Sequence, residues 1–147
     1  MSLVLGADLS MKRSALVLLD SSHMVRASET FPIAKGPKLN LRASGLFIRK
    51  LKAYNMANLV VIENNDHQVW YRPLMHSLLM ACQLHNLPTL AATPSQIRKA
   101  LLGKGNATKE QVRAWLESEH EIAFSDDEGM DLSDAAACAA YGIRSLK

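Results

Sequence analysis

The sequence lacks the features that mark a secreted or membrane protein. Among 147 residues there are only two cysteines, and no apolar run approaches the roughly 18 residues that a membrane-spanning helix needs. The opening segment has no basic residue and reaches a carboxylate at Asp8, so we expect no signal peptide. Cys82 and Cys138 lie in apolar stretches. We expect both to be reduced, buried thiols in a cytoplasmic protein without a membrane partner.

Aromatic residues are also scarce, because Phe, Trp and Tyr together make up 5% of the chain. A hydrophobic fraction of 48% is nevertheless ordinary for a folded protein and too high for a disordered one. There is no internal repeat, low-complexity tract or linker. We therefore expect residues 1–147 to form one domain around a single, mostly aliphatic core.

Acidic residues are rare in the first three quarters of the chain. Residues 1–109 hold 14 of the 17 Lys and Arg but only five of the 14 Asp and Glu, whereas residues 110–134 hold nine acids and one base. A domain that is basic over most of its length can attract a polyanion such as nucleic acid, although most such charges only keep a surface hydrated. The few acids in the basic part therefore stand out: Asp8, Asp20, Glu29, Glu63 and Asp66.

Hydrophobic periodicity predicts ten elements in the order βββαβαβααα. Strands are expected at residues 2–8, 14–20, 24–31, 58–63 and 89–92, and helices at 39–56, 69–85, 94–102, 108–120 and 131–146, with an acidic loop over 123–130. The first three strands should form an antiparallel meander. Thr93-Pro94 and the Thr-x-x-Gln pattern at 108–111 are signals for the start of a helix. The order predicts an α/β fold, a mixed sheet with helices on its faces.

Carboxylates occur where three of these elements end or begin. Asp8 closes the first strand, Glu63 closes the fourth, and Asp131 and Asp134 open the last helix, three residues apart and so on one face. Acids gathered in a site of low dielectric repel one another, and a divalent cation relieves that repulsion. Hard oxygen ligands suit Mg²⁺ or Mn²⁺, so the pattern predicts a metal site built from four carboxylates.

Each acid also has a purely structural interpretation. Asp131 or Asp134 could be the N-cap of the last helix, where the helix dipole favours an acid. Asp8 could accept backbone hydrogen bonds in the following turn, and Glu63 could pair with an arginine. The spacings His-x-x-x-His and Cys-x-x-Cys are absent, which argues against zinc.

These segments resemble the RuvC-type Holliday junction resolvases of the ribonuclease H-like superfamily, and a compact, phage-type member would fit. The resemblance is carried, in the family's order, by residues 6–8, 15–19, 60–64, 94–112 and 131–137, of which 94–112 is the most specific. It implies a ribonuclease H-like fold with a five-stranded mixed sheet, the first three strands antiparallel, flanked by helices. It also implies a homodimer that binds four-way DNA junctions and cuts two strands symmetrically, in DNA recombination and repair.

The resemblance also implies roles for single residues. Asp8, Glu63, Asp131 and Asp134 fall on the family's four metal-binding carboxylates, which would hold two Mg²⁺ or Mn²⁺ ions per active site. Lys109 falls on a basic residue close to that site and would act in catalysis. The sequence departs from the family after Glu63, where an aromatic wedge for the junction is replaced by residues 64–68, Asn-Asn-Asp-His-Gln.

Other side chains are candidates for DNA contacts. We expect several basic residues near the predicted site to bind phosphates, with a hydrated surface charge as the alternative for each: Lys12, Arg13, Arg98, Lys99, Lys104 and Lys109. Trp70 and Tyr71 follow the position of the missing wedge and could stack on unpaired bases, or pack in an interface or the core. The apolar helix at 69–85 could pack between two subunits or in the core.

The sequence thus predicts a metal-dependent, structure-selective endodeoxyribonuclease that acts on branched DNA. One alternative is a ribonuclease H-like nuclease that acts on RNA–DNA hybrids or flaps. Another is a junction-binding protein with weak or no catalysis. An actin-like or sugar-kinase ATPase begins with a similar strand, but it uses two related domains, for which 147 residues are too few.

Overall fold

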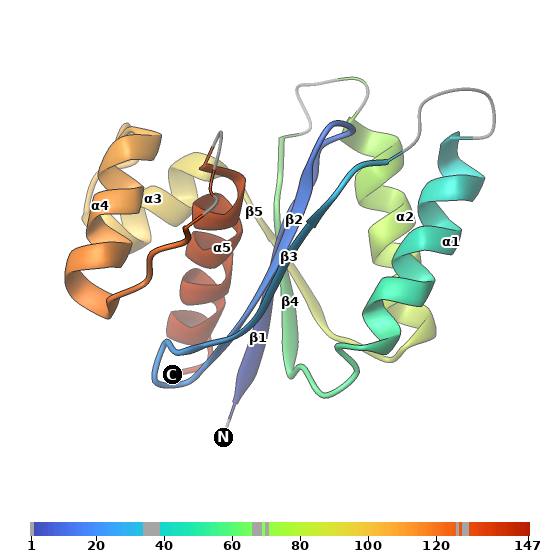
Figure 1. The fold of residues 1–147 in the computed structure, drawn as a ribbon, viewed down its shortest axis with the longest axis horizontal. Coiled ribbons are helices and arrows are strands. Elements are labelled where there is room, and N and C mark those ends of the chain that lie inside the picture. Colours follow the sequence, from blue (N-terminus) through green and yellow to red (C-terminus); the bar gives the residue numbers. More distant parts are fainter. Residues whose placement is uncertain (1, 34–38, 66–68, 70, 126, 128–129) are drawn as a thin grey trace.

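The computed structural model describes residues 2–33, 39–65, 69, 71–125, 127 and 130–147, which form a five-stranded mixed sheet with helices on both faces (Figure 1). The strand order is β3-β2-β1-β4-β5. The strands are β1 (Leu3–Asp8), β2 (Ser14–Asp20), β3 (Val25–Phe31), β4 (Leu59–Glu63) and β5 (Thr89–Ala92). The first three strands are antiparallel, as predicted, whereas β4 runs parallel to both β1 and β5. β1 and β4 therefore end at the same edge of the sheet.

The helices form two layers. α1 (Leu39–Lys52) and α2 (Tyr71–Leu84) cover one face, and α3 (Pro94–Leu102), α4 (Lys109–His120) and α5 (Asp131–Ser145) cover the other (Figure 1). Successive strand side chains point to opposite faces, so the sheet separates two aliphatic clusters where one core was expected. β2 is buried at all seven positions, which accounts for its apolar sequence. None of the helices described is long and apolar enough to cross a membrane.

The predicted helix boundaries are close to those observed, and the differences have local causes. The helix expected over 39–56 ends at Lys52 because the chain continues as a turn, in which the amide of Tyr54 donates to the carbonyl oxygen of Leu51 at 2.9 Å. The predicted start of α3 is confirmed, because the Thr93 hydroxyl accepts a hydrogen bond from the amide of Gln96 at 3.2 Å.

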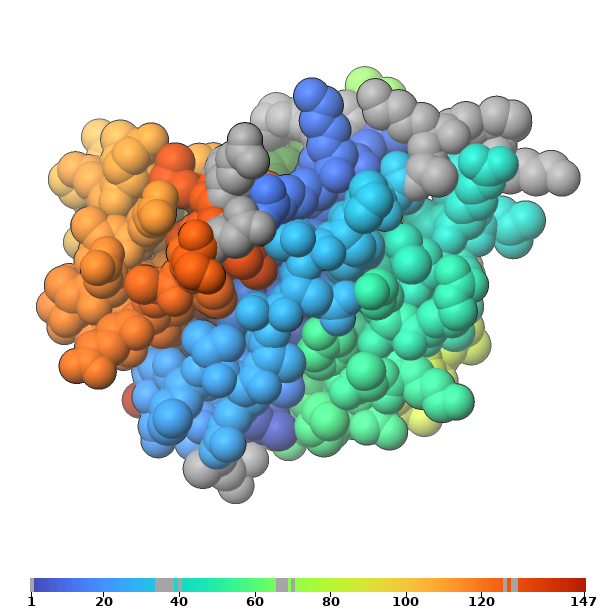
Figure 2. All heavy atoms as spheres, viewed as in Figure 1, coloured from blue at the N-terminus to red at the C-terminus, as the bar shows by residue number. Residues whose placement is uncertain are grey.

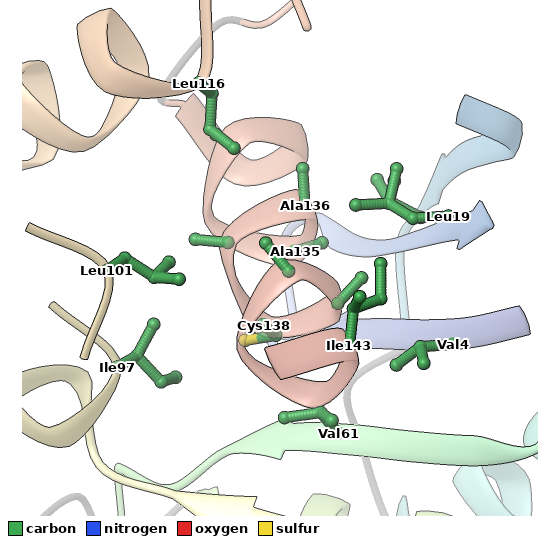
Figure 3. Packing of buried hydrophobic residues seen from close by; sticks show 14 of the residues in the cluster. Val4, Leu19, Val61, Ile97, Leu101, Leu116, Ala135, Ala136, Cys138 and Ile143 are labelled. Atoms are coloured by element: carbon green, nitrogen blue, oxygen red, sulfur yellow. The ribbon is translucent and has the colours of Figure 1, made fainter. Parts of the chain in front are cut away.

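α5 lies directly on the sheet because small residues meet at the contact. A methyl group added to Gly6 of β1 would overlap the carbonyl oxygen of Ala135 and lie 2.6 Å from the amide nitrogen of Ala139. One added to Gly142 would lie 2.5 Å from a methyl group of Val61 in β4. Figure 3 shows how short side chains of α5 fill this part of the core. The helix backbone therefore approaches β1 closely along its first half.

We expect Gly6→Ala to lower the free energy of unfolding by about 2–3 kcal/mol, because the added methyl group forces α5 away from β1. Gly45→Ala in α1 is the matched control, since its new methyl group would meet only Arg49 Nη1, at an ordinary 3.7 Å. The better helix propensity of alanine should raise the stability of this control by about 0.5–1 kcal/mol. Urea denaturation measures both, and a Gly6→Ala variant as stable as the native protein would contradict the close packing.

Candidate active site

Three of the four predicted carboxylates meet at one edge of the sheet. Asp8 ends β1 and Glu63 ends β4, and these strands are parallel neighbours. Asp134 reaches the same place from the first turn of α5, which packs on β1. Carboxylate oxygens of these three residues all lie within 4.8 Å of one another. The predicted convergence is therefore confirmed for Asp8, Glu63 and Asp134, which we call the acidic triad.

The acidic triad is almost closed to solvent, with 7% of Asp8, 8% of Glu63 and 6% of Asp134 exposed. Burial, followed by the charges of Glu63 and Asp134, raises the pKa of Asp8 well above its ordinary value. Burial and the charge of Asp134 also raise the pKa of Glu63. The hydrogen bond between Asp8 and Glu63 raises the pKa of Asp8 further and partly offsets the upward shift of the pKa of Glu63.

Asp131, the fourth predicted carboxylate, lies at the rim of the site. Its side chain is 21% exposed, and its Oδ2 is 3.9 Å from Nε of Arg13 in the turn after β1. Burial raises the pKa of Asp131, while the charges of Lys109 and Arg13 oppose the shift. The charge of Asp131 also contributes to the raised pKa of Asp8, which places it beside the acidic triad although outside the closest group.

Two cations approach the acidic triad, one from α3 and one from the first turn of α4. Lys109 Nζ lies 2.9 Å from Asp134 Oδ2. Burial disfavours the Lys109 charge, but the hydrogen bond and the charge of Asp134 outweigh that effect and raise the pKa of Lys109. Arg98 donates from Nη1 to the carbonyl oxygen of Ala107 at 3.1 Å, and its charge lowers the pKa of Glu63. Both residues therefore offset negative charge in the site.

Local sequence signals place Lys109 at the start of α4. The Thr108 hydroxyl accepts from the amide of Gln111 at 3.1 Å, and the Gln111 side chain accepts from the amide of Thr108 at 2.9 Å. This is the predicted capping box. Gly103 ends α3 in the left-handed region at φ 87°, where glycine meets no steric penalty. These two caps define the turn that brings Lys109 to Asp134.

Asp127, which falls in the loop predicted over 123–130, caps α5 from outside the helix. Its Oδ1 accepts from the amide of Leu132 at 2.9 Å, and its Oδ2 accepts from the hydroxyl of Ser133. Met130, directly before the helix, has φ 61° and provides no side-chain cap. Neither Asp131 nor Asp134 is therefore needed as the N-cap. No standard capping pattern in the sequence indicates an acid four residues before the helix.

Tyr71 is a core residue, which corrects the prediction that it could stack on DNA bases. Its side chain is fully buried, and its hydroxyl donates to the carbonyl oxygen of Glu63, so neither ring face is available to a base. Trp70, the other predicted stacking residue, lies outside the described residues.

Cys138, one helical turn after Asp134, is fully buried behind the site, and burial and the charge of Glu63 raise the pKa of its thiol. Cys82 is also free and buried, as expected for both cysteines.

The remaining basic candidates are at the surface. Lys12 lies next to Arg13 in the turn after β1 and is exposed. Lys99 on α3 and Lys104 in the turn after it are exposed as well. In the described part of the chain, Arg13, Arg98 and Lys109 interact with the carboxylates, whereas no such interaction is seen for Lys12, Lys99 and Lys104.

The donor set of the acidic triad fits a hard divalent cation. One carboxylate oxygen from each of the three residues lies within 4.8 Å of the other two, and burial, followed for Asp8 and Glu63 by the charges of neighbouring acids, raises their pKa values. Oxygen donors of this kind suit Mg²⁺ and Mn²⁺. Within the described residues no histidine joins the cluster, and the Cys138 thiol is held in its neutral form.

In the metal-free protein, Asp8 and Glu63 should contribute less to stability as the pH rises from acidic to neutral. The raised pKa values mean that Asp8 and Glu63 bind protons more tightly in the folded state than in the unfolded chain. Their stabilising contribution is therefore present at low pH and is lost as the pH rises through the folded-state values. Asp8→Asn removes one charge, so we expect a higher Tm than that of the native protein at neutral pH in EDTA, and a flatter pH dependence.

Asp20→Asn is the control, for which we expect a change in Tm of the opposite sign. Asp20 is buried as well, but hydrogen bonds from the amides of Ser22 and Met24 and from Arg26 outweigh burial and lower its pKa. That variant should have a lower Tm at neutral pH. Thermal denaturation with and without Mg²⁺ checks both, and added Mg²⁺ should raise the Tm of the native protein more than that of Asp8→Asn. If the Tm of Asp8→Asn in EDTA were no higher than that of the native protein, the predicted repulsion within the acidic triad would be refuted.

No protein-family model matches the sequence. The fold is nevertheless the ribonuclease H-like fold of RuvC and of viral and mitochondrial Holliday junction resolvases. The structure of Thermus thermophilus RuvC superposes with a TM-score of 0.76 at 17% identity, over 97% of this chain and 94% of that one. The same protein in complex with a Holliday junction substrate gives a TM-score of 0.77 at 16% identity, over 99% and 96%.

Two further similarities agree. The yeast mitochondrial Holliday junction resolvase Ydc2 superposes with a TM-score of 0.67 at 16% identity, over 97% of this chain and 78% of that one. In sequence, the crossover junction endodeoxyribonuclease RuvC of Oleidesulfovibrio alaskensis is 37% identical over 59 residues. That match spans 40% of this chain and 34% of the relative, so the chain matches about a third of that protein's length.

Proposed function

We propose that this chain is a metal-dependent endodeoxyribonuclease that resolves four-way DNA junctions. The observation that carries the proposal is the buried acidic triad of Asp8, Glu63 and Asp134, with a lysine beside it, on a resolvase fold. A protein that only bound phosphates would gain nothing from pooled negative charge. The free, buried thiols are consistent with action in the reducing cytoplasm.

The roles of the residues follow from where they lie. The acidic triad, with Asp131 at the rim, would hold Mg²⁺ or Mn²⁺, and we propose two ions per site. Bound there, these ions supply the Lewis acidity that activates a water molecule and stabilises the leaving oxygen. The Lys109 ammonium, beside Asp134, would offset charge that develops on the scissile phosphate. Water would add to phosphorus and the bond to the 3′ oxygen would break, leaving 5′ phosphate and 3′ hydroxyl ends.

Branched DNA is the substrate that the comparisons favour. Two of the similar structures, from Thermus thermophilus and from fowlpox virus, are complexes with Holliday junction DNA. Arg13 at Asp131 and Arg98 at Ala107 place cations around the site, where we propose phosphate contacts together with the exposed Lys12, Lys99 and Lys104. These contacts would be salt-sensitive and largely independent of DNA sequence.

The test is cleavage of a four-way junction with Mg²⁺, beside a duplex, a flap and an RNA–DNA hybrid. We expect the native protein to cut the junction, and Asp8→Asn to lose at least about a thousandfold in rate, because one ligand to the cations is removed. Lys109→Met should lose about a hundredfold, as expected for one charge that acts on the transition state. Junction binding by Asp8→Asn, measured by fluorescence anisotropy, should be retained.

Full activity of Asp8→Asn would refute the catalytic assignment. Preferred cleavage of the hybrid or the flap would instead establish a different nuclease on the same fold. Junction binding without cleavage in Mg²⁺ or Mn²⁺ would leave a binding protein.

We also propose that two copies of the chain form the active assembly through α2. The inner face of α2 packs in the core, but Met80 and Leu84, one turn apart, are 56% and 62% exposed. Two sites on a symmetric dimer would cut two strands of a junction symmetrically.

Sedimentation should show a dimer that Met80→Asp with Leu84→Asp converts to a monomer. Met24→Asp, at a residue 61% exposed beside β3, is the control and should leave the dimer intact.

A further inference from the structure

The uneven charge of the sequence becomes a difference between the two helical layers. α1 and α2 contain no acidic residue. Four cations lie on α1, namely Arg42, Arg49, Lys50 and Lys52. The opposite layer holds α4, the described residues that follow it and the start of α5, which together contain seven acids. Figure 1 shows these layers on opposite sides of the sheet. A polyanion is therefore attracted to the layer of α1 and α2 and repelled by the acidic part of the other layer, from the end of α4 to the start of α5.

Two of the α1 cations flank a hollow. Arg42 and Arg49 are seven residues apart, so they share a face of the helix and lie about 10 Å apart along its axis. A depression of about 400 Å³ lies between them. Gly45 lies between the two arginines, and its lack of a side chain leaves space in the depression. Pro32 and Ile33, after β3, line another side of it. We call this depression the α1 groove. Figure 2 shows α1 and β3 side by side on this face of the molecule.

The cations of α1 differ in what they do. Lys50 has a structural role, because its Nζ lies 2.6 Å from Glu29 Oε1 and 4.9 Å from the centre of the Phe31 ring. Arg49 is exposed, and none of the described carboxylates pairs with it. Arg42 is exposed as well, one turn from the start of the helix. Arg42 and Arg49 are therefore both exposed to solvent, and both line the α1 groove.

A short path connects the α1 groove to the candidate active site. Ile33 lines the groove, and its amide donates to the carbonyl oxygen of Met11 at 2.9 Å. Met11 belongs to the turn after β1, which also carries Lys12 and the Arg13 that pairs with Asp131. β3 runs in the same direction as β1, so its end lies at the same edge of the sheet as the acidic triad. DNA held at the site can therefore continue over this turn to α1.

We propose that the α1 groove binds the phosphate backbone of a DNA arm that leads away from the cleaved strand. This inference rests on the proposed function, since it names where an arm of the branched substrate lies. The distance of about 10 Å between the turns that carry Arg42 and Arg49 corresponds to about three base-pair steps along one strand, so both arginines can contact one backbone. Gly45 lets the strand approach the helix.

The test compares charge reversals in the Asp8→Asn background, where the DNA is bound without being cut. Arg42→Glu with Arg49→Glu should weaken binding to a junction with long arms at least tenfold in fluorescence anisotropy, and the slope of log affinity against log salt should fall by about two. On junctions with arms too short to reach α1, the difference should disappear. Arg113→Glu with Lys147→Glu, two exposed cations elsewhere, is the matched control and should change affinity less than twofold.

Gly45→Glu is a second variant, because it places an acid in the α1 groove while both arginines remain. We expect the same loss on long-armed junctions. Affinities equal to that of the matched control would overturn the inference, and so would an equal loss on short-armed junctions. In both cases the native protein would still bind and cut the junction. A native protein that neither binds nor cuts junctions would overturn the proposed function instead, which keeps the two failures distinct.

Discussion

The close contact between α5 and β1 is the constraint on which the rest of the site depends. Gly6 lets the helix backbone approach the strand so nearly that even one methyl group would overlap it. Because α5 is held at that distance, Asp134 in its first turn reaches Asp8 at the end of the strand. A longer side chain at the contact would separate the two carboxylates. The alanines of α5 therefore determine the geometry of the acidic triad as well as the packing.

The acidic triad is a local conflict that the fold maintains by packing. Three buried carboxylates repel one another, and burial alone already disfavours their charged forms. The strands, the buried Tyr71 beneath Glu63 and the Asp127 cap of α5 hold them together nonetheless. Lys109 and Arg98 relieve part of the repulsion, and a divalent cation would relieve more. A divalent cation bound there would therefore reduce the mutual repulsion of the carboxylates.

The two helical layers contribute different residues to the site and to the surface. The layer of α3, α4 and α5 carries Asp134 and the two cations that meet the acidic triad, and its outer part is strongly acidic. The layer of α1 and α2 contributes the buried floor under Glu63 and an outer surface with basic and apolar residues. β1, β3 and β4 end at the edge of the sheet where the carboxylates lie, so both layers border that edge.

The order of the strands and helices, the caps at Thr93 and Thr108 and the choice of acids could all be predicted from the sequence. Each depends on neighbours within a turn or on the periodicity of one element. The capping role of Asp127, the burial of Tyr71 and the rim position of Asp131 could not be predicted, because each depends on which distant segment packs against the residue. The sequence by itself determined which carboxylates and cations are available at the ends of these elements. Only the tertiary structure decided how near they come, since that distance is determined by packing between α5 and the sheet.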